Sequence, residues 1–179
     1  MKTEKINGAE ALLKSLVNEG VEIIFGYPGG SIMPFYDELY NYGDRIRHIL
    51  VRHEQGAVHA AEGYARATGR VGVCVATSGP GATNLITGLA DALMDSTPVV
   101  CITAQVISSK LGTNYFQEAD TIGITIPVTK WNYQITNASE ISGVIAKAFY
   151  VARSGRPGPV LISLTRDAQV EMTEYRYEQ

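Results

Sequence analysis

The sequence lacks long apolar runs and a surplus of positive charge. No stretch approaches the roughly 20 apolar residues that span a bilayer. The opening residues, MKTEKINGAEALLKS, include early acidic side chains and no apolar segment of the signal-peptide kind. The 15 Lys and Arg are scattered and are outnumbered by 18 Asp and Glu, which argues against nucleic-acid binding. We therefore expect a cytoplasmic protein with neither a membrane nor a nucleic acid as partner.

Cysteine and histidine are both scarce. The two cysteines, Cys74 and Cys101, fall within apolar runs, which is more typical of buried free thiols in a reducing compartment than of a disulfide or a metal site. The three histidines, His48, His53 and His59, show no metal-ligand spacing with a cysteine or a second carboxylate. We therefore expect no metal site within the chain.

Several common catalytic motifs are also missing. The glycine-rich segments GYPGG and SGPG match neither the dinucleotide-binding pattern G-x-G-x-x-G nor the P-loop with its lysine. TSGPG lacks the Gly-x-Ser-x-Gly order of a nucleophile elbow, and no Ser-His-Asp arrangement can be placed. Nucleophilic hydrolysis is therefore poorly supported.

Strand-like and helix-like segments alternate along the 179 residues, a length typical of one domain. The expected strands are residues 21–26, 46–51, 71–77, 98–104, 128–135 and 160–164. Helices are expected between them, among them a first helix whose apolar spacing starts at Ile6 and which Gly20 ends, and one over residues 82–94. This alternation predicts a three-layer α/β fold, an open and mostly parallel six-stranded sheet with helices on both faces. We assign residues 1–170 to this domain and interpret the polar residues 171–179 as a tail or the start of a linker.

Unusual residues follow four of the predicted strands. GYPGG follows the first strand, RHE the second, TSGPG the third and AQV the fourth. Because ligands bind at the carboxyl ends of the strands in open α/β sheets, these four segments predict one site.

Glu54 opens a helix predicted over residues 54–68, which ends at Gly69 in the position where a left-handed cap favours glycine. The helix dipole favours a carboxylate in the first turn by about 0.3 to 1 kcal/mol. Position alone therefore leaves a structural role for Glu54 open beside a functional one.

The same helix has a face almost free of side chains. Its small residues recur at helical spacing and are Gly56, Ala60, Gly63 and Ala67. Tight packing within the domain and packing across a subunit interface would both explain this small-residue stripe. Glu62 and Arg66 have the favourable i, i+4 order, and we interpret them as a solvent-exposed pair.

Five blocks, in order, resemble the amino-terminal domain of the large catalytic subunit of acetolactate synthase (acetohydroxyacid synthase). They are FGYPGGSIMPFYDEL, RHEQGAVHAAEGYARATG, VCVATSGPGATNLITGLADALMDSTPVV, FQEAD and SGRPGPVLISL, and the resemblance covers about residues 4–170. The block HEQGAVHAAEGYARATG is typical of thiamine-diphosphate enzymes of the pyruvate oxidase and decarboxylase group. GYPGG and FQEAD narrow the resemblance to the synthase branch and imply a thiamine-diphosphate pyrimidine-binding domain.

The resemblance implies roles for individual residues. Glu54 matches the carboxylate that hydrogen-bonds N1′ of the cofactor's aminopyrimidine and so favours the tautomer able to remove the C2 proton. Gln117 matches a residue near the reacting carbon. The remaining matches are cofactor contacts, namely Tyr27, Pro28, Gly30, Pro80 and Asn84 around the pyrimidine and Arg156 at FAD.

The resemblance also implies an activity. Enzymes of this family decarboxylate pyruvate and condense the two-carbon hydroxyethyl unit with a second 2-oxo acid, pyruvate or 2-oxobutyrate, in branched-chain amino-acid biosynthesis. They use thiamine diphosphate, Mg²⁺ and FAD and form homodimers or higher homo-oligomers, some with a small regulatory subunit. A separate domain with a Gly-Asp-Gly motif holds the diphosphate and Mg²⁺, whereas Gly43 and Asp44 here are followed by Arg45. We therefore expect these 179 residues to be inactive alone.

Some positions depart from the family pattern. Ile107 replaces a proline and Tyr115 a small residue in the segment that lines the family's substrate entrance, while Thr165 and Arg166 stand where Pro-Lys is common. Two alternatives stay open. One is a separate pyrimidine-binding subunit of a split thiamine-diphosphate 2-oxo acid decarboxylase, such as sulfopyruvate decarboxylase, and the other is a non-catalytic domain that retains the fold.

Overall fold

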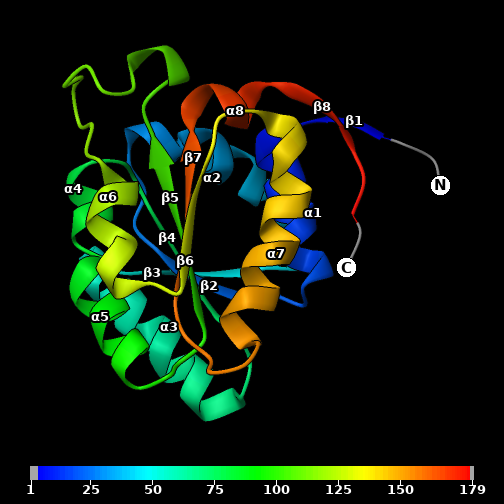
Figure 1. Ribbon diagram of the computed structural model, residues 1–179. Helices are drawn as coiled ribbons and strands as arrows, with labels where there is room; N and C mark the ends of the chain where they lie inside the picture. Colours follow the sequence, from blue (N-terminus) through cyan, green and yellow to red (C-terminus); the bar gives the residue numbers. More distant parts are fainter. Residues whose placement is uncertain (1–3, 178–179) are drawn as a thin grey trace.

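The computed structural model describes residues 4–177 and is built around a six-stranded sheet. The strands are parallel throughout, in the order β3-β2-β4-β5-β7-β6. Their bounds are β2 Ile23–Gly26, β3 Arg47–Leu50, β4 Gly72–Ala76, β5 Val99–Gln105, β6 Trp131–Ile135 and β7 Val160–Thr165. All six predicted strands are present, and the predicted three-layer α/β fold is confirmed (Figure 1).

Helices cover both faces of this sheet (Figure 1). The first face carries α1 (Gly8–Asn18), α2 (Met33–Leu39) and α7 (Ile141–Arg153). The second carries α3 (Glu54–Thr68) and α5 (Ile86–Met94), with α4 (Pro80–Thr83) and α6 (Thr121–Thr125) beside them. The short helix α8 (Arg166–Val170) follows β7, and the 3-10 turns are η1 (Gly30–Ile32), η2 (Tyr40–Tyr42), η3 (Ser108–Lys110), η4 (Ile126–Val128) and η5 (Ala138–Glu140).

The central strands are buried on both faces, which explains their continuous apolar sequences. Val73 and Val75 of β4 pack toward α1, α2 and α7, whereas Cys74 and Ala76 pack toward α3 and α5. Cys74 and Cys101 are register partners on neighbouring strands, and both are buried and free, as predicted. Burial raises the pKa of the Cys101 thiol.

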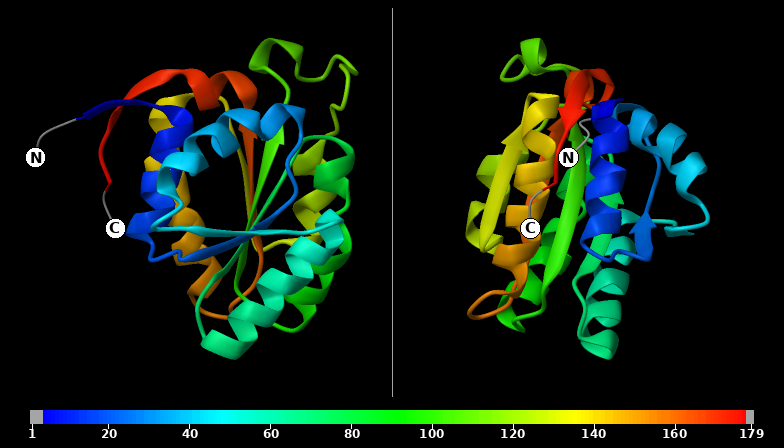
Figure 2. Two further views of the ribbon diagram at one scale, coloured as in Figure 1. Left: turned by 180° about the vertical axis from the view of Figure 1, so that it is seen from behind. Right: turned by 90° about the vertical axis from the view of Figure 1, so that its right-hand side faces the viewer.

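A second sheet was not predicted. β1 (Glu4–Asn7) pairs antiparallel with β8 (Met172–Tyr175), and Figure 2 shows this ribbon at one side of the molecule. The polar residues after 171 therefore include a strand, and Ile6, expected in the first helix, lies in β1. Asn7 caps α1 by accepting a hydrogen bond from the Glu10 backbone N–H at 2.8 Å.

The predicted domain limits are only partly covered by the structure. Residues 1–3, 178 and 179 lie outside the described residues, and the domain boundary at residue 170 stays a prediction. In the part of the chain that is described, no helix combines the length and apolar character needed to cross a membrane.

Candidate cofactor-binding site

The strand order reverses direction at β2. β3 lies on one side of β2 and β4 on the other, and such a switch point leaves a crevice beyond the carboxyl ends of the strands. The segments that follow β2, β3 and β4 contain Tyr27, Glu54 and Pro80 respectively. The predicted convergence of strand ends therefore falls at the place where this fold class binds ligands.

Glu54 is the first residue of α3, and its side chain is buried, with 8% of the residue exposed. His53, not Glu54, is the N-cap, because its Nδ1 accepts the hydrogen bond of the Gln55 backbone N–H at 3.2 Å. The carboxylate instead accepts a hydrogen bond from Asn84 Nδ2 at Oε2, at 2.9 Å. The helix dipole still favours a negative charge here, but capping does not require Glu54.

A break in the predicted helix brings the Asn84 side chain within hydrogen-bonding distance of Glu54. The helix expected over residues 82–94 is divided into α4 and α5. At the break, the Leu85 backbone N–H bonds the Ala82 carbonyl three residues back, at 3.1 Å, in place of the four-residue spacing of an α-helix. Asn84 lies in this tight turn, from which its amide donates to Glu54.

Two glycines pack beside Thr77, and one of them, Gly81, also lies beside the Glu54 carboxylate. A Cβ added at Gly81 would lie 3.2 Å from Glu54 Oε1 and 2.8 Å from Thr77 Cγ2, and one added at Gly29 would lie 2.5 Å from Thr77 Cβ. Thr77 Oγ1 is buried and has no hydrogen-bond partner among residues 4–177. An acceptor carboxylate and an unpartnered hydroxyl, with glycine backbone packed beside them, suit a flat heterocycle that donates a hydrogen bond, so these residues fit an aminopyrimidine.

Gln117 reaches the same region from the loop between β5 and α6. Its φ is +57°, a left-handed conformation that is uncommon for a residue other than glycine and is concentrated at functional sites. Gly79, also at φ +57°, lies against it, because a Cβ there would be 2.5 Å from the Gln117 carbonyl oxygen. The turn after β4 therefore supports the backbone of Gln117 directly.

A pocket of about 520 Å³ opens beside Gln117. Its lining comprises Gly30, Ser31, Met33, Val106, Ile107, Tyr115, Phe116, Gln117 and Arg166. The two departures from the family pattern in this segment, Ile107 and Tyr115, both line it, and Phe116 is 78% exposed. Arg166 is the one cationic side chain among these residues. A largely apolar pocket with one cation suits a small organic anion.

The other predicted cofactor contacts lie along this edge of the sheet. Tyr27 is 41% exposed, and its backbone N–H bonds the Val75 carbonyl at 3.2 Å. Pro28 and Gly30 belong to the turn between β2 and α2, and Pro80 starts α4. These residues follow the strands that flank the crevice, as Glu54 and Asn84 do.

Arg156 does not join this group. It precedes β7 and so lies at the opposite, amino-terminal edge of the sheet. Its Nε donates to Ser96 Oγ at 2.8 Å, and its Nη2 donates to the carbonyls of Leu93 at 3.1 Å and Met94 at 2.9 Å. Arg156 thus caps the carboxyl end of α5, and its predicted FAD contact stays a prediction.

The sequence reasoning missed a set of supporting side chains behind the pocket. Ser31 Oγ and Ser78 Oγ lie 2.9 Å apart, and Gln169 Nε2 donates to the Ser31 carbonyl at 2.9 Å. Gln169 is fully buried, and its Oε1 has no partner among the described residues. Ser78 could have been noticed within TSGPG, whereas Gln169 had no signal because the fold alone brings α8 to the turn after β2.

Two interpretations of α3 need revision. Glu62 is only 3% exposed, so the predicted solvent-exposed pair with Arg66 is wrong for Glu62. Gly56 and Gly63 face open space, with no atom within 4 Å of an added Cβ. The small-residue stripe is therefore not explained by packing within the described part of the domain.

Comparison with known proteins agrees with this geometry. Residues 6–124 match the family described as "Thiamine pyrophosphate enzyme, N-terminal TPP binding domain". The chain is 57% identical over 166 residues to the acetolactate synthase large subunit of Corynebacterium glutamicum, covering 93% of this chain and 26% of that protein. It is 54% identical over 176 residues to that of Lactococcus lactis subsp. lactis (97% and 30%). It is 56% identical over 165 residues to the acetolactate synthase isozyme 2 large subunit of Escherichia coli (92% and 30%).

The chain thus spans less than a third of the length of these curated relatives. The family match nevertheless covers most of the chain and includes Glu54, Asn84 and Gln117. We conclude that the chain belongs to the thiamine pyrophosphate enzyme family and contains its N-terminal TPP-binding domain.

Proposed function

We propose that this chain is the pyrimidine-binding part of an acetolactate synthase, which removes CO₂ from pyruvate and joins the remaining two-carbon unit to a second 2-oxo acid. Identities of 54 to 57% to acetolactate synthase subunits over more than nine-tenths of the chain support this activity. The single observation that carries it is the buried Glu54 carboxylate, held by Asn84 at the switch-point crevice. Because the chain spans under a third of those relatives, we propose that it acts within a larger assembly.

The proposed role of Glu54 is to hold a proton-bearing ring nitrogen. Bound thiamine diphosphate would supply a nucleophilic carbon once its C2 proton has been removed. Asn84 fixes Oε2 of Glu54, so the carboxylate keeps one orientation and Oε1 remains available to accept the hydrogen bond of the ring nitrogen. Burial keeps water away and strengthens this interaction in a low-dielectric environment.

The pocket beside Gln117 is the proposed substrate entrance. Arg166 supplies the positive charge that a 2-oxo acid carboxylate needs, and the apolar side chains accommodate a methyl or ethyl group. Tyr115 and Ile107 narrow this space and are the residues we expect to set the preference between pyruvate and 2-oxobutyrate. Gln117 lies next to the position of the reacting carbon in this proposal.

Other cofactors and partners remain part of the proposal. We assign Mg²⁺ to a diphosphate-binding domain outside these residues, and FAD to a site that includes Arg156. The exposed small-residue stripe on α3 supports association with a second subunit, in a homodimer or higher homo-oligomer. A small regulatory subunit and a cytoplasmic location are proposed from the family alone.

The substitution Glu54→Gln tests the proposal in the complete assembly. A neutral amide cannot accept the charge-assisted bond, so we expect acetolactate formation from pyruvate to fall by about 10²- to 10⁴-fold. Exchange of the cofactor's C2 hydrogen with deuterium, followed by NMR, should slow in parallel. Glu22→Gln is the control, because this exposed carboxylate pairs with Arg70 at the other edge of the sheet.

Three other outcomes would count against the proposal. Unchanged exchange and activity in Glu54→Gln would favour a non-catalytic domain. Release of CO₂ without condensation by the unsubstituted assembly would favour a split 2-oxo acid decarboxylase. If the assembly formed product only from other 2-oxo acids, the proposed cofactor role would stand, but pyruvate would be the wrong substrate.

A further inference from the structure

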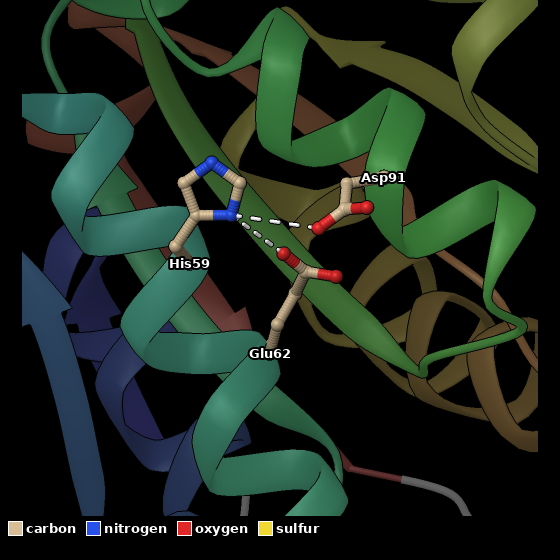
Figure 3. Close-up of side chains that lie close together, drawn as sticks. All are labelled: His59, Glu62 and Asp91. Atoms are coloured by element: carbon tan, nitrogen blue, oxygen red, sulfur yellow. Dashed lines mark hydrogen bonds and ion pairs between the residues drawn. The ribbon is translucent and has the colours of Figure 1, made fainter.

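A histidine and two carboxylates converge outside the crevice, between α3 and α5. His59 and Glu62 are one turn apart on α3, and Asp91 of α5 points toward them (Figure 3). His59 Nδ1 lies 2.8 Å from Glu62 Oε2 and 3.7 Å from Asp91 Oδ2. One ligand atom from each residue lies within 4.8 Å of the other two. Ligand atoms about 2.0 to 2.2 Å from a tetrahedral metal ion are roughly 3.4 Å apart, so small rotations would place all three around one ion.

The charges in this cluster are unbalanced. Glu62 is buried, and Arg66 donates to its other oxygen, Oε1, at 3.2 Å and to Asp95 at 2.7 Å. With a neutral imidazole, the carboxylates of Glu62, Asp91 and Asp95 face one guanidinium, which leaves a net charge of −2. Arg66 compensates the buried Glu62, and the remaining charge lies on Asp91 and Asp95, whose side chains are 49% and 51% exposed. One divalent cation bound by Glu62 and Asp91 would balance this group.

The ligand types and their exposure narrow the choice of ion. In the single chain, the side chains of His59 and Asp91 are 39% and 49% exposed, which leaves room for water ligands on the ion. Imidazole with carboxylates suits Zn²⁺ and similar ions, whereas Mg²⁺ and Ca²⁺ prefer oxygen ligands alone. We propose that His59, Glu62 and Asp91 bind a divalent transition-metal ion of the Zn²⁺ class, with the imidazole proton on Nε2. This proposal replaces the expectation of no metal site, which considered only spacing along the chain, whereas Asp91 comes from a second helix.

Such an ion would join two helices that already pack closely. A Cβ added at Gly88 of α5 would lie 2.2 Å from Val58 Cγ1 of α3. α3 starts with Glu54, and α5 follows the turn that contains Asn84, so a clamp between them secures the two segments whose side chains meet in the crevice. The site is separate from the Mg²⁺ of the cofactor and does not depend on the proposed activity.

Metal titration of the complete protein, freed of metal with a chelator, tests this site. Zn²⁺ followed by calorimetry, and Co²⁺ followed by visible absorption, should show one saturable site per chain that Mg²⁺ does not occupy. Asp91→Asn and His59→Ala should weaken this binding at least tenfold and abolish the rise in melting temperature that Zn²⁺ produces. Asp95→Asn makes the same charge change nearby but removes no ligand, so it should weaken binding far less than Asp91→Asn does.

Two results would overturn the assignment. One is the absence of saturable Zn²⁺ or Co²⁺ binding by the unsubstituted protein. The other is equal binding by Asp91→Asn and Asp95→Asn, which would place the ion elsewhere. Asp91 is half exposed, so its substitution should leave the fold intact, and circular dichroism of both variants checks this.

Discussion

At the residue scale, the site depends on contacts between segments that are distant in sequence. Glu54 could be singled out from its position after a strand, but its bond to Asn84 could not, because that bond needs the tight turn between α4 and α5. Glu62 was misjudged for a related reason. The i, i+4 spacing with Arg66 is real, yet the Glu62 carboxylate is buried, on a helix that packs against β4, β5 and α5.

The contact between Gly79 and Gln117 yields a prediction at this scale. Gly79→Ala puts a Cβ 2.5 Å from the Gln117 carbonyl oxygen and a side chain at φ +57°. We expect the free energy of unfolding to fall by about 1 to 3 kcal/mol and activity to fall with it, as measured by urea titration and initial rates.

Gly143→Ala is the matched control. Gly143 lies inside α7 with open space around an added Cβ, so alanine should stabilise the helix by about 0.5 to 1 kcal/mol. Equal effects of the two substitutions would contradict the proposed contact between the turn after β4 and Gln117.

At the element scale, one carboxylate organises the loop that leads to Gln117. Glu118 accepts hydrogen bonds from the backbone N–H groups of Gly112, of Thr113 at 3.1 Å and of Tyr115 at 3.1 Å. The bond from Gly112 contributes most to lowering the pKa of Glu118 below its ordinary value. Because the folded-state pKa is lowered, the stabilisation is present above the pKa of the unfolded chain and is lost as pH falls through the folded-state pKa.

Glu118→Ala should therefore loosen this loop. The three backbone N–H groups lose their acceptor, so we expect faster amide exchange over residues 111–117 by mass spectrometry, with the sheet unaffected. The unsubstituted protein should approach the same exchange pattern when acidified below the folded-state pKa of Glu118. Protection that stays unchanged in Glu118→Ala would show that the loop is held by other contacts.

Burial explains which strands and helices could be predicted from the sequence. Strands such as β4 and β5 were predicted because burial on both faces demands unbroken apolar sequence. β1 and β8 have four residues each and are partly exposed. Neither sequence therefore shows an apolar pattern that would predict a strand, and each forms a strand only by pairing with the other. The division between α4 and α5 was missed because residues 82–94 keep helical periodicity across the break.

At the scale of the whole molecule, the small-residue stripe on α3 has no partner in the described part of the chain. Two glycines inside a helix each cost about 0.5 to 1 kcal/mol relative to alanine, and the open space at Gly56 and Gly63 shows no offsetting contact. A second subunit that packs closely on this face would provide one. The sequence could identify the stripe, but only the fold shows that it faces outward.

Gly63→Leu should therefore weaken association of the complete protein. A bulky side chain would hold the second subunit away from α3, and sedimentation velocity should show more dissociated protein at a given concentration. Gly143→Leu is the comparison, because it makes the same change at an open position on α7. An unaltered distribution for Gly63→Leu would exclude this face as the interface.

The ribbon of β1 and β8 also determines how the domain responds to force. Its register pairs Glu4 with Tyr175 at the outer end and Asn7 with Met172 at the inner end. Tension applied at residues 4 and 175 would load one pair of strand residues at a time, so the ribbon opens stepwise like a zipper. The next connection inward is the bond from the Gly8 backbone N–H to the Glu171 carbonyl, at 3.0 Å. Tension at these residues therefore separates β1 from β8 before it is transmitted to the six-stranded sheet and the crevice.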